Sequence, residues 1–286
     1  MIEDVRTTSG RGARPTAEVV KHLFVLLVLS ATFFPLYMML NISTKTNRDF
    51  FRDPWVPRHV EASVVRDNYA QAWRTIGFSI PNTMFLCAST SGLKLVAAIL
   101  AAYVFARFAF PLKGLLWAGV MVLMLMPGVA NLVPLFTQLR DMGLLNTYAA
   151  LVLTGAAAGQ TFNLFILRSF IEDTPEELFE AAEVDGAGHL GKIWHVVVPM
   201  NGSIIATLAC LSIVSVWNNF MLPLLIVRDP SRQVTAVALY RLANAYVREW
   251  GPTMAAYTIA AVPLVVMFLF TMRYFVRGVA AGSIKG

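Results

Sequence analysis

The sequence has little charge and few of the residues that build metal or disulfide sites. Only 14% of its 286 residues are Asp, Glu, Lys or Arg, and it holds two cysteines and four histidines. A soluble domain carries roughly 25% charged residues, so the composition argues against an ordinary soluble protein. Cys87 and Cys210 each lie in an apolar run, which favours two buried hydrophobic side chains over a disulfide or a metal pair.

Other absences bear on function. No Gly-Lys-Ser or Gly-Lys-Thr phosphate loop occurs, so the chain is not expected to hydrolyse ATP or to be a catalytic subunit. His22, His59, His189 and His195 all lie outside the interior of the apolar runs, which argues against a membrane-embedded enzyme. An ion-coupled carrier would usually show acids within its membrane spans or internal repeats, and neither is present. No catalytic or metal-binding residue is predicted.

What is present is apolar sequence in runs long enough to cross a bilayer. The chain is 57% hydrophobic with a mean hydropathy of +0.62, and a membrane helix needs roughly 20 mostly apolar residues. Six runs qualify: Val20–Leu40, Pro81–Phe105, Leu115–Leu135, Tyr148–Phe170, Ile204–Val227 and Met254–Tyr274. The predicted fold is an all-α, polytopic membrane helix bundle. Its net charge of +6 is explained by lysines and arginines flanking the spans, without a nucleic-acid partner.

Six spans place both termini on one side of the membrane. Lys and Arg divide equally between the two sides, but the N-terminus and the short loop with Arg107 and Lys113 favour a cytoplasmic location for the termini. The first run lacks a cleavage signal and is predicted to be an uncleaved span. The predicted organisation is an N-terminal tail (1–18), a transmembrane domain (19–278) with an external loop (41–79) and a charged internal loop (171–200), and a C-terminal tail (279–286).

The charged segment Pro175–Pro199, PEELFEAAEVDGAGHLGKIWHVVVP, interrupts this apolar sequence. Thr174, Pro175 and Glu177 predict a helix start with a capping box, and Gly186 predicts its end. A second short helix is expected to carry an apolar stripe of Leu190, Ile193, Trp194 and Val197. A helix lying on lipid normally has a basic polar face. This segment is acidic, so a protein partner with a basic groove fits it better than the lipid surface.

The segment EAAEVDGAGHLGKIWHVVVP resembles the EAA signature of inner-membrane permeases of binding-protein-dependent ABC importers. The matching positions are Glu180, Ala181, Ala182, Asp185, Gly186, Ala187, Trp194 and Pro199. Further stretches, among them AAYVFARFAFP, MPGVANLVPLF, WNNFMLPL and the tail FVRGVAAGSIKG, resemble carbohydrate importers of the maltose type, in particular the shorter, MalG-like partner of a permease pair. Members often carry a second proline where this chain has Ser203, which leaves docking details open.

The resemblance implies a cytoplasmic EAA loop that docks on an ATPase dimer, a second and different permease chain, an external solute-binding protein and a sugar as substrate. ATP would bind the ATPase, and this chain would bind no cofactor. Glu180 is expected to pair with a basic group of the ATPase, while Ala181, Ala182 and Gly186 allow close packing. Import of another solute, such as glycerol phosphate, a polyamine or an acidic sugar, stays open as an alternative.

Polar side chains inside the spans are candidates for the substrate path. They are Gln160 and Asn163 in the fourth span, Trp217, Asn218 and Asn219 in the fifth, and Lys94 in the second. Amides and an aromatic ring suit a sugar, although amides also join helices to one another in membranes. A cation in mid-span costs at least ~2.5 kcal/mol. Lys94 is therefore stabilised by a carbonyl, a partner subunit or water, or else it attracts an anionic sugar such as a uronate.

Overall fold

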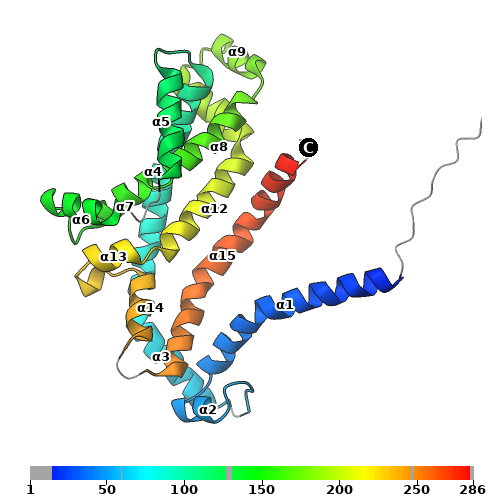
Figure 1. The fold of residues 1–286 in the computed structure, drawn as a ribbon, viewed down its shortest axis with the longest axis vertical. Coiled ribbons are helices and arrows are strands. Elements are labelled where there is room, and N and C mark those ends of the chain that lie inside the picture. The colour runs from blue at the N-terminus through cyan, green and yellow to red at the C-terminus, as the bar shows by residue number, and fades with distance from the viewer. Residues whose placement is uncertain (1–14, 59, 127–130, 246–247, 284–286) are drawn as a thin grey trace, which may run out of the picture. The chain divides into compact units, whose positions relative to one another are not determined.

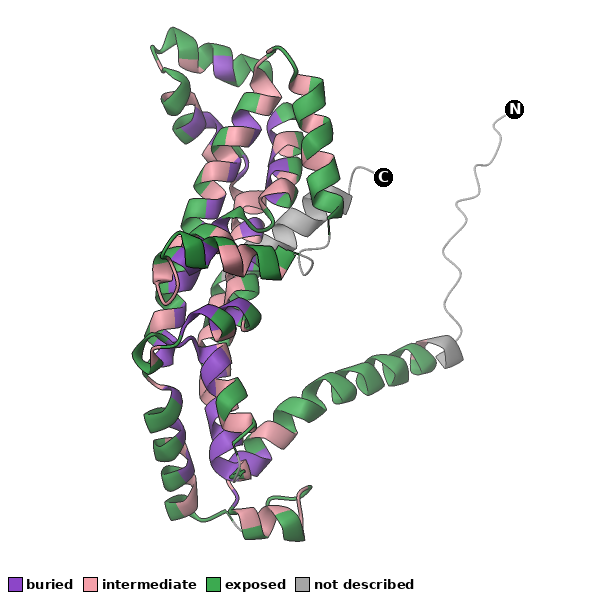
Figure 2. Ribbon diagram, turned by 60° about the vertical axis from the view of Figure 1, so that its left-hand side comes forward, coloured by how far each residue is buried: buried purple, intermediate pink, exposed green. Residues whose placement is uncertain are grey.

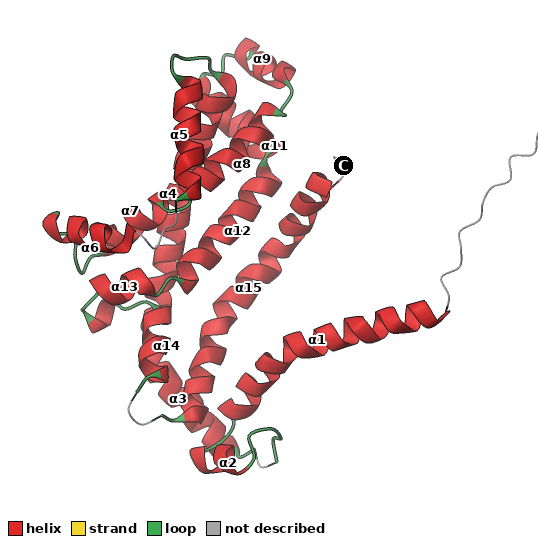
Figure 3. Ribbon diagram, in the orientation of Figure 1, coloured by secondary structure: helices red, strands yellow, loops and turns green. Residues whose placement is uncertain are grey.

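The computed structural model describes residues 15–58, 60–126, 131–245 and 248–283, and these residues form helices joined by loops and turns, with no strand (Figure 3). The longer helices are α1 (Pro15–Ser43), α3 (Ala62–Ile76), α4 (Ser79–Arg107), α5 (Lys113–Leu125), α6 (Leu132–Asp141), α7 (Tyr148–Ala157), α8 (Gln160–Glu172), α9 (Glu176–Val184), α12 (Gly202–Asn218), α14 (Thr235–Ala243) and α15 (Trp250–Ser283). The short ones are α2 (Asn47–Arg52), α10 (His189–Lys192), the π-helical turn η2 (Ile193–Val197), α11 (Val198–Met200), α13 (Met221–Ile226) and the 3₁₀ turn η3 (Pro230–Arg232). The fold class is therefore all-α, as the apolar runs predict.

The chain forms two compact units. The first comprises the residues up to Tyr69 together with Glu249–Thr258, and the second comprises Ala70–Arg248 and the rest of α15. In the first unit, α1 exposes its apolar side chains along most of its length (Figure 2). Such a surface is unfavourable in water and suits the hydrocarbon of a bilayer.

Polar contacts close the lower part of the first unit, where α1 ends. The Asn68 amide donates hydrogen bonds to the carbonyls of Ser43 and Lys45, each at 2.9 Å. A Cβ on Gly251 would lie only 2.3 Å from the Lys45 carbonyl oxygen, so only glycine fits at this approach. The Trp250 ring stacks on Phe50 with centroids 4.7 Å apart.

The second unit is built around α4, which packs against α7, α8, α12 and α14 (Figure 1). Two larger core clusters among its described residues are each formed by helices far apart in sequence. One joins Ala98 and Ala102 of α4 to α8, α12 and the charged loop, and the other joins Leu86 of α4 to α6, α7, α13 and α14. The long central helix therefore contacts both ends of the second unit.

The predicted spans correspond to helices with three differences. The first, second and sixth lie within α1, α4 and α15, which are the three helices long and apolar enough to cross a membrane. The fourth is two helices, α7 and α8, bent by 47° at Ala158–Gly159. The fifth predicted span is interrupted after Asn218, where α12 ends, and continues as α13 from Met221. An 84° bend also separates α12 from the helical segment before it.

The third predicted span does not appear as one continuous membrane-length helix. Helix α5 has 13 residues and ends at Leu125, which at 1.5 Å per residue is about 20 Å, short of the roughly 30 Å hydrocarbon core. Residues 127–130 of the predicted span, Pro127 included, lie outside the described residues. Counting each bent pair as one span gives up to five membrane crossings in the described chain, and six spans stay a prediction.

Candidate functional site

The charged loop, residues 171–200, begins differently from the predicted capping box. Helix α9 starts at Glu176 after Pro175, and no side chain caps it. The Thr174 hydroxyl instead donates back to the carbonyl of Phe170 at 3.2 Å, and it lies 3.5 Å from the Asn201 amide, which donates to it. The capping-box prediction is therefore wrong. Thr174 closes the end of α8 rather than the start of α9, because the adjacent proline already fixes the backbone there.

Arg107, the last residue of α4, joins that helix to the charged loop. Its guanidinium donates to the carbonyls of Ile171, at 3.0 Å, and Thr174, and it forms an ion pair with Glu176. The same group lies 3.9 Å from the centroid of the Phe179 ring. The Arg107 side chain is only 14% exposed. Arg107 therefore fixes both the end of α8 and the start of α9, a role that its position beside an apolar run did not indicate.

The turn Asp185-Gly186-Ala187 ends α9 with a Schellman motif. The Ala187 N–H donates to the Ala182 carbonyl at 2.8 Å, and the Gly186 N–H donates to the Glu183 carbonyl at 2.9 Å. Gly186 has φ +82°, the left-handed conformation that this motif requires and that glycine adopts without steric cost. The helix break predicted at Gly186 is thus confirmed. Its geometry gives the signature residues Ala182, Gly186 and Ala187 a direct backbone role.

The second arm of the loop, α10 to α11, divides the predicted apolar stripe between two faces. Ile193 and Val197 are buried in the core shared with α4, α8 and α12, whereas Leu190 is exposed and Trp194 is 70% exposed. The wider π-helical turn η2 changes the angular spacing of the side chains, so residues three and four apart no longer form one stripe. The single stripe predicted for this arm is therefore wrong. The arm has an inner apolar face and an outer one.

An ion pair closes the angle between the two arms. The Lys192 ammonium donates to the Glu183 carboxylate at 2.5 Å. This hydrogen bond, and then the Lys192 charge, hold the pKa of Glu183 below its ordinary value of 4.5 despite a small opposing effect of burial. At neutral pH both groups are charged and the arms are held together.

Most of the signature residues lie on the outside of the loop. Glu180, Ala181, Asp185, Gly186, Trp194 and Pro199 are exposed, while Ala182 and Ala187 are half-buried. Val184 and Leu190, which are large and apolar, are exposed beside them in the sequence. Inside, Phe179, Ile193 and Val196 belong to the same core cluster as Leu167 of α8. The loop therefore presents a mixed acidic and apolar outer surface while its inner surface is part of the core.

The residues predicted for the substrate path fall into two groups. Trp217 is buried against Ile80 and Cys87, whereas Asn218 and Asn219 are exposed at the break between α12 and α13. The Asn218 amide donates to the Val214 carbonyl of its own helix at 2.9 Å. The structure thus does not bring the Trp217 ring and the Asn218 amide onto one surface.

Lys94, Gln160 and Asn163 form the second group, and they lie where α4 packs against the start of α8. Lys94 lies near the middle of α4, and Gln160 and Asn163 lie on the first turn of α8, which packs against α4. Lys94 and Asn163 are buried, and Gln160 is half-buried. The α7–α8 break that positions them was missed by sequence reasoning, although the Gly159 at its centre was a visible signal.

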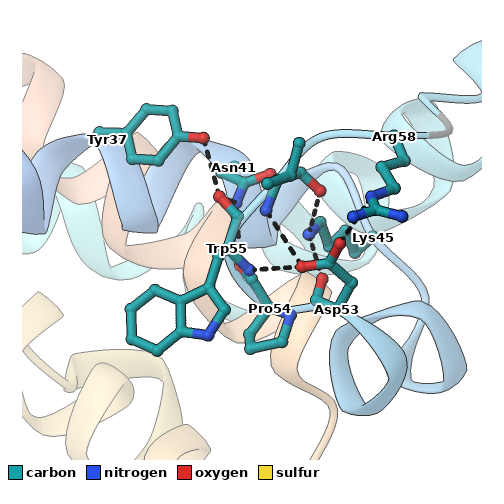
Figure 4. Close-up of polar contacts among 8 residues, drawn as sticks. Tyr37, Asn41, Lys45, Asp53, Pro54, Trp55 and Arg58 are labelled. Atoms are coloured by element: carbon teal, nitrogen blue, oxygen red, sulfur yellow. Dashed lines mark hydrogen bonds and ion pairs between the residues drawn. The ribbon is translucent and has the colours of Figure 1, made fainter.

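A second polar cluster lies in the first unit and organises the predicted external loop (Figure 4). The Lys45 ammonium donates to the carbonyls of Asp53 and Val56 at 2.5 and 2.8 Å. The Asp53 carboxylate accepts from the N–H groups of Trp55 and Val56 and pairs with Arg58 at 2.8 Å. Burial is the largest single influence on the pKa of Asp53 and raises it, but the two backbone N–H groups, Arg58 and Lys45 together outweigh burial and lower this pKa overall. A cavity of about 250 Å³ beside them is lined by Lys45, Asp49, Arg52, Asp53, Val56 and Arg58. Lys45, Asp53 and Arg58 already bind one another or the loop backbone, so we assign the cluster a structural role.

Known proteins match most of the chain. The family described as "Binding-protein-dependent transport system inner membrane component" matches residues 94–281. The "Probable ABC transporter permease protein YurM" of Bacillus subtilis (strain 168) is 34% identical over 269 residues, covering 92% of this chain and 87% of that protein. The "Melibiose/raffinose/stachyose import permease protein MelC" of the same organism is 31% identical, covering 96% of this chain and all of that protein.

A solved structure has the same fold. It is the crystal structure of a bacterial ABC transporter involved in the import of the acidic polysaccharide alginate, with a TM-score of 0.82, 17% identity and coverage of 93% of this chain and all of that chain. The similarity of fold, the family match over residues 94–281 and the two relatives above 30% identity agree with the helical architecture described here. The chain therefore belongs to the family of inner membrane components of binding-protein-dependent transport systems.

Proposed function

We propose that this chain is a permease subunit of an ATP-driven carbohydrate importer, and that the EAA loop, residues 171–200, docks on the ATPase. The single observation that carries the coupling role is the two-faced construction of this loop. Its inner residues Phe179, Ile193 and Val197 share a core with α4, α8 and α12, while Glu180, Gly186 and Trp194 face outward. A partner that moves the outer face would therefore move the packed helices as well.

The chain itself performs no chemical step in this proposal. ATP would bind the ATPase dimer. This chain would form the translocation path with a second permease, and an external solute-binding protein would deliver the solute to that path. The family description, which names binding-protein-dependent transport, supports the external binding protein. Carbohydrate cargo is supported by MelC, whose name specifies import of melibiose, raffinose and stachyose. Both termini and the EAA loop would lie in the cytoplasm, and the loop 41–79 on the opposite side.

Cysteine labelling tests the orientation. Both native cysteines, Cys87 and Cys210, are buried, so they should react little with a membrane-impermeant maleimide. Glu180 and Phe51 are both exposed. We expect Glu180→Cys to be labelled only after cells are opened, and the matched control Phe51→Cys to be labelled in intact cells. Labelling of Glu180→Cys in intact cells would overturn the proposal, because a cytoplasmic ATPase could not reach the loop.

Coupling is tested in reconstituted vesicles that contain the whole transporter. Glu180→Lys reverses an exposed charge, and Gly186→Asp adds a carboxylate at a turn where a Cβ would meet no other atom within 4 Å. Both variants should insert normally but uncouple sugar uptake from ATP hydrolysis. An exposed control such as Glu61→Lys, in the external loop, should transport at the wild-type rate. Equal uptake per ATP in wild type and both loop variants would contradict the proposed coupling role.

The cargo class is tested by identifying the solute that the matching external binding protein holds. Native mass spectrometry of that protein after purification, followed by calorimetry with the solute found, should return a sugar or an oligosaccharide. A glycerol phosphate or a polyamine would leave the importer assignment in place and replace the carbohydrate cargo.

A further inference from the structure

Lys94 is the starting point, because it is a buried cation in the middle of a membrane helix. The residue is 5% exposed and lies near the midpoint of α4. None of the described residues gives its ammonium group a hydrogen bond or an ion pair. A charge at this depth normally has a partner and marks a path for ions or substrate.

Another buried lysine of the same chain shows what a satisfied ammonium group looks like. Lys45 is 4% exposed and donates to two backbone carbonyls within 2.8 Å, as Figure 4 shows. Those carbonyls come from an irregular loop, where backbone oxygens are free. Lys94 is surrounded by helices, whose inner carbonyls are used within the helices themselves. No described carbonyl, including the unpaired ones at the end of α7, accepts a hydrogen bond from it. Its partner must therefore come from outside the backbone around it.

The Lys94 ammonium points toward the break between α7 and α8. It lies 4.0 Å from the position that a Cβ on Gly159 would occupy. Gly159 has φ +73° and immediately precedes α8, whose first turn is not capped by any side chain. The first N–H groups of a helix have no partner within the helix, and they favour an anion. Lys94 and the start of α8 thus offer positive charge and N–H donors to the same space.

Four further polar atoms, on the neighbouring turns of α4 and α8, are also without partners. Among the described side chains, Oε1 of Gln160 and Nδ2 of Asn163 are buried and have no hydrogen bond. The hydroxyl oxygens of Thr90 and Ser91 are also buried and also have none. Thr90 and Ser91 precede Lys94 by four and three residues on α4, so all three share one face of that helix. Buried polar groups in native proteins are normally satisfied, so this group of orphan atoms points to a polar ligand.

The close approach of α7 to α4 fixes the geometry. Gly155 and Gly159 stand four residues apart, and a Cβ on Gly155 would lie 2.7 Å from Cγ2 of Thr90. Small residues at this spacing let two membrane helices pack closely. A small cavity lined by Thr90 and Gly155 extends to Asn219 at the α12–α13 break. Thr90, which carries one of the orphan atoms, thus shares this cavity with Asn219, a residue predicted for the substrate path.

We propose that Lys94, the first turn of α8 and the side chains of Gln160 and Asn163 form an anion-binding subsite on the translocation path. It would take a carboxylate or phosphate group carried by a sugar, with Lys94 and Asn163 Nδ2 as donors to the anion and Gln160 Oε1 as acceptor from a sugar hydroxyl. This inference rests on the proposed import function and specifies the chemical class of its cargo.

The test measures uptake by the complete transporter in proteoliposomes. Each cargo is supplied at high concentration, so that uptake does not depend on how tightly the external binding protein holds it. Three cargoes of equal length are compared: a neutral oligosaccharide, one with uronate carboxylates and one with a sugar phosphate. Lys94→Met removes the charge with little change in volume. Losing a charged hydrogen bond should lower uptake of the anionic cargo by about 10- to 100-fold while neutral uptake stays within about 2-fold.

Two further variants serve as matched tests. Lys94→Arg retains the charge and should retain anionic uptake within about 3-fold. Asn163→Asp is nearly isosteric and places a carboxylate beside Lys94, so it should lower anionic uptake as Lys94→Met does, because the new carboxylate competes with the cargo. If the Lys94→Met transporter fails to assemble, Asn163→Asp alone decides between an anion-binding role and a structural role for Lys94.

The outcomes separate the subsite from the importer function. Whichever anionic cargo loses uptake in Lys94→Met identifies the anion as carboxylate or phosphate. If wild type carries only neutral sugar, or if all cargoes fall equally in the variants, Lys94 is a structural residue and the subsite is refuted while the importer function stands. If wild type shows no ATP-driven uptake of any sugar, the proposed function itself fails.

Discussion

The contact between Arg107 and the EAA loop gives the sharpest quantitative prediction. Arg107→Ala removes the donors to the carbonyls of Ile171 and Thr174, the ion pair with Glu176 and the contact over the Phe179 ring. The loop would then be held to α4 by its apolar inner face and by the contact between the Tyr103 hydroxyl and Nδ1 of His189, 3.2 Å apart. We expect α9 to open locally far more often, while the rest of the second unit stays folded.

The magnitude follows from these contacts. Each hydrogen bond from a charged donor contributes about 1.5–3 kcal/mol and the ring contact about 0.5–1 kcal/mol. Glu176 is 65% exposed, so its ion pair adds at most about 1 kcal/mol. Because contacts of one side chain are not additive, we expect a total loss of about 3 kcal/mol, which is roughly a 100-fold rise in local opening.

Hydrogen exchange of the purified transporter in lipid nanodiscs measures this opening. Amides of α9 should exchange roughly 100-fold faster in Arg107→Ala, by the estimate above, and those of α12 should not change. Arg107→Lys keeps the charge but loses the planar fork of donors and should lie between the two. Glu176→Gln should resemble wild type. Unchanged α9 exchange in Arg107→Ala would refute the reasoning, and an equal effect of Glu176→Gln would assign the stabilisation to the ion pair instead of the carbonyl contacts.

Three other predictions concern single positions. Gly186→Ala should destabilise α9 by about 1–2 kcal/mol, because residue 186 has a positive φ. Gly186→Asn should destabilise it by less, because asparagine tolerates this conformation. Thermal unfolding and hydrogen exchange of α9 measure the difference between the two variants. Lys192→Gln should raise the pKa of Glu183 toward 4.5, as measured by carbon-13 NMR of its carboxylate. Because folding lowers this pKa, the wild-type ion pair stabilises the loop at pH values above 4.5. That stabilisation is lost as the pH falls from 4.5 through the lowered pKa of Glu183. Gly251→Ala should prevent normal folding of the first unit, since its Cβ would overlap a backbone oxygen, whereas Gly202→Ala, with open space around it, should unfold like wild type.

The helical fold and the family could be predicted from the sequence, because apolar run length and the EAA signature are local properties. The turn at Gly186 was predictable for the same reason. The break at Gly159 was not predicted, because the run from Tyr148 to Phe170 is long and apolar enough to be one continuous span. A glycine within an apolar run becomes a break only when a close neighbour, here α4, favours the bent form.

The contacts of the site were less predictable than its motif. Arg107 was interpreted only as a flanking charge, since the carbonyls that it binds lie more than 60 residues later in the chain. The stripe from Leu190 to Val197 was assigned to one face because an ordinary helix was assumed, and the π-helical turn changes that spacing. The grouping of Lys94 with Gln160 and Asn163 depends on the packing of three helices, which no local pattern specifies.

The two-faced construction of the EAA loop also bears on how such transporters diverge. Residues such as Phe179 and Val197 are constrained by the interior of their own chain. Glu180, Leu190 and Trp194 are exposed and, if the loop docks on an ATPase as proposed, are constrained by that partner instead. The outer positions can therefore change together with a new ATPase without disturbing the membrane helices. Transplanting only those outer residues from one importer to another should be enough to exchange the ATPase that drives it.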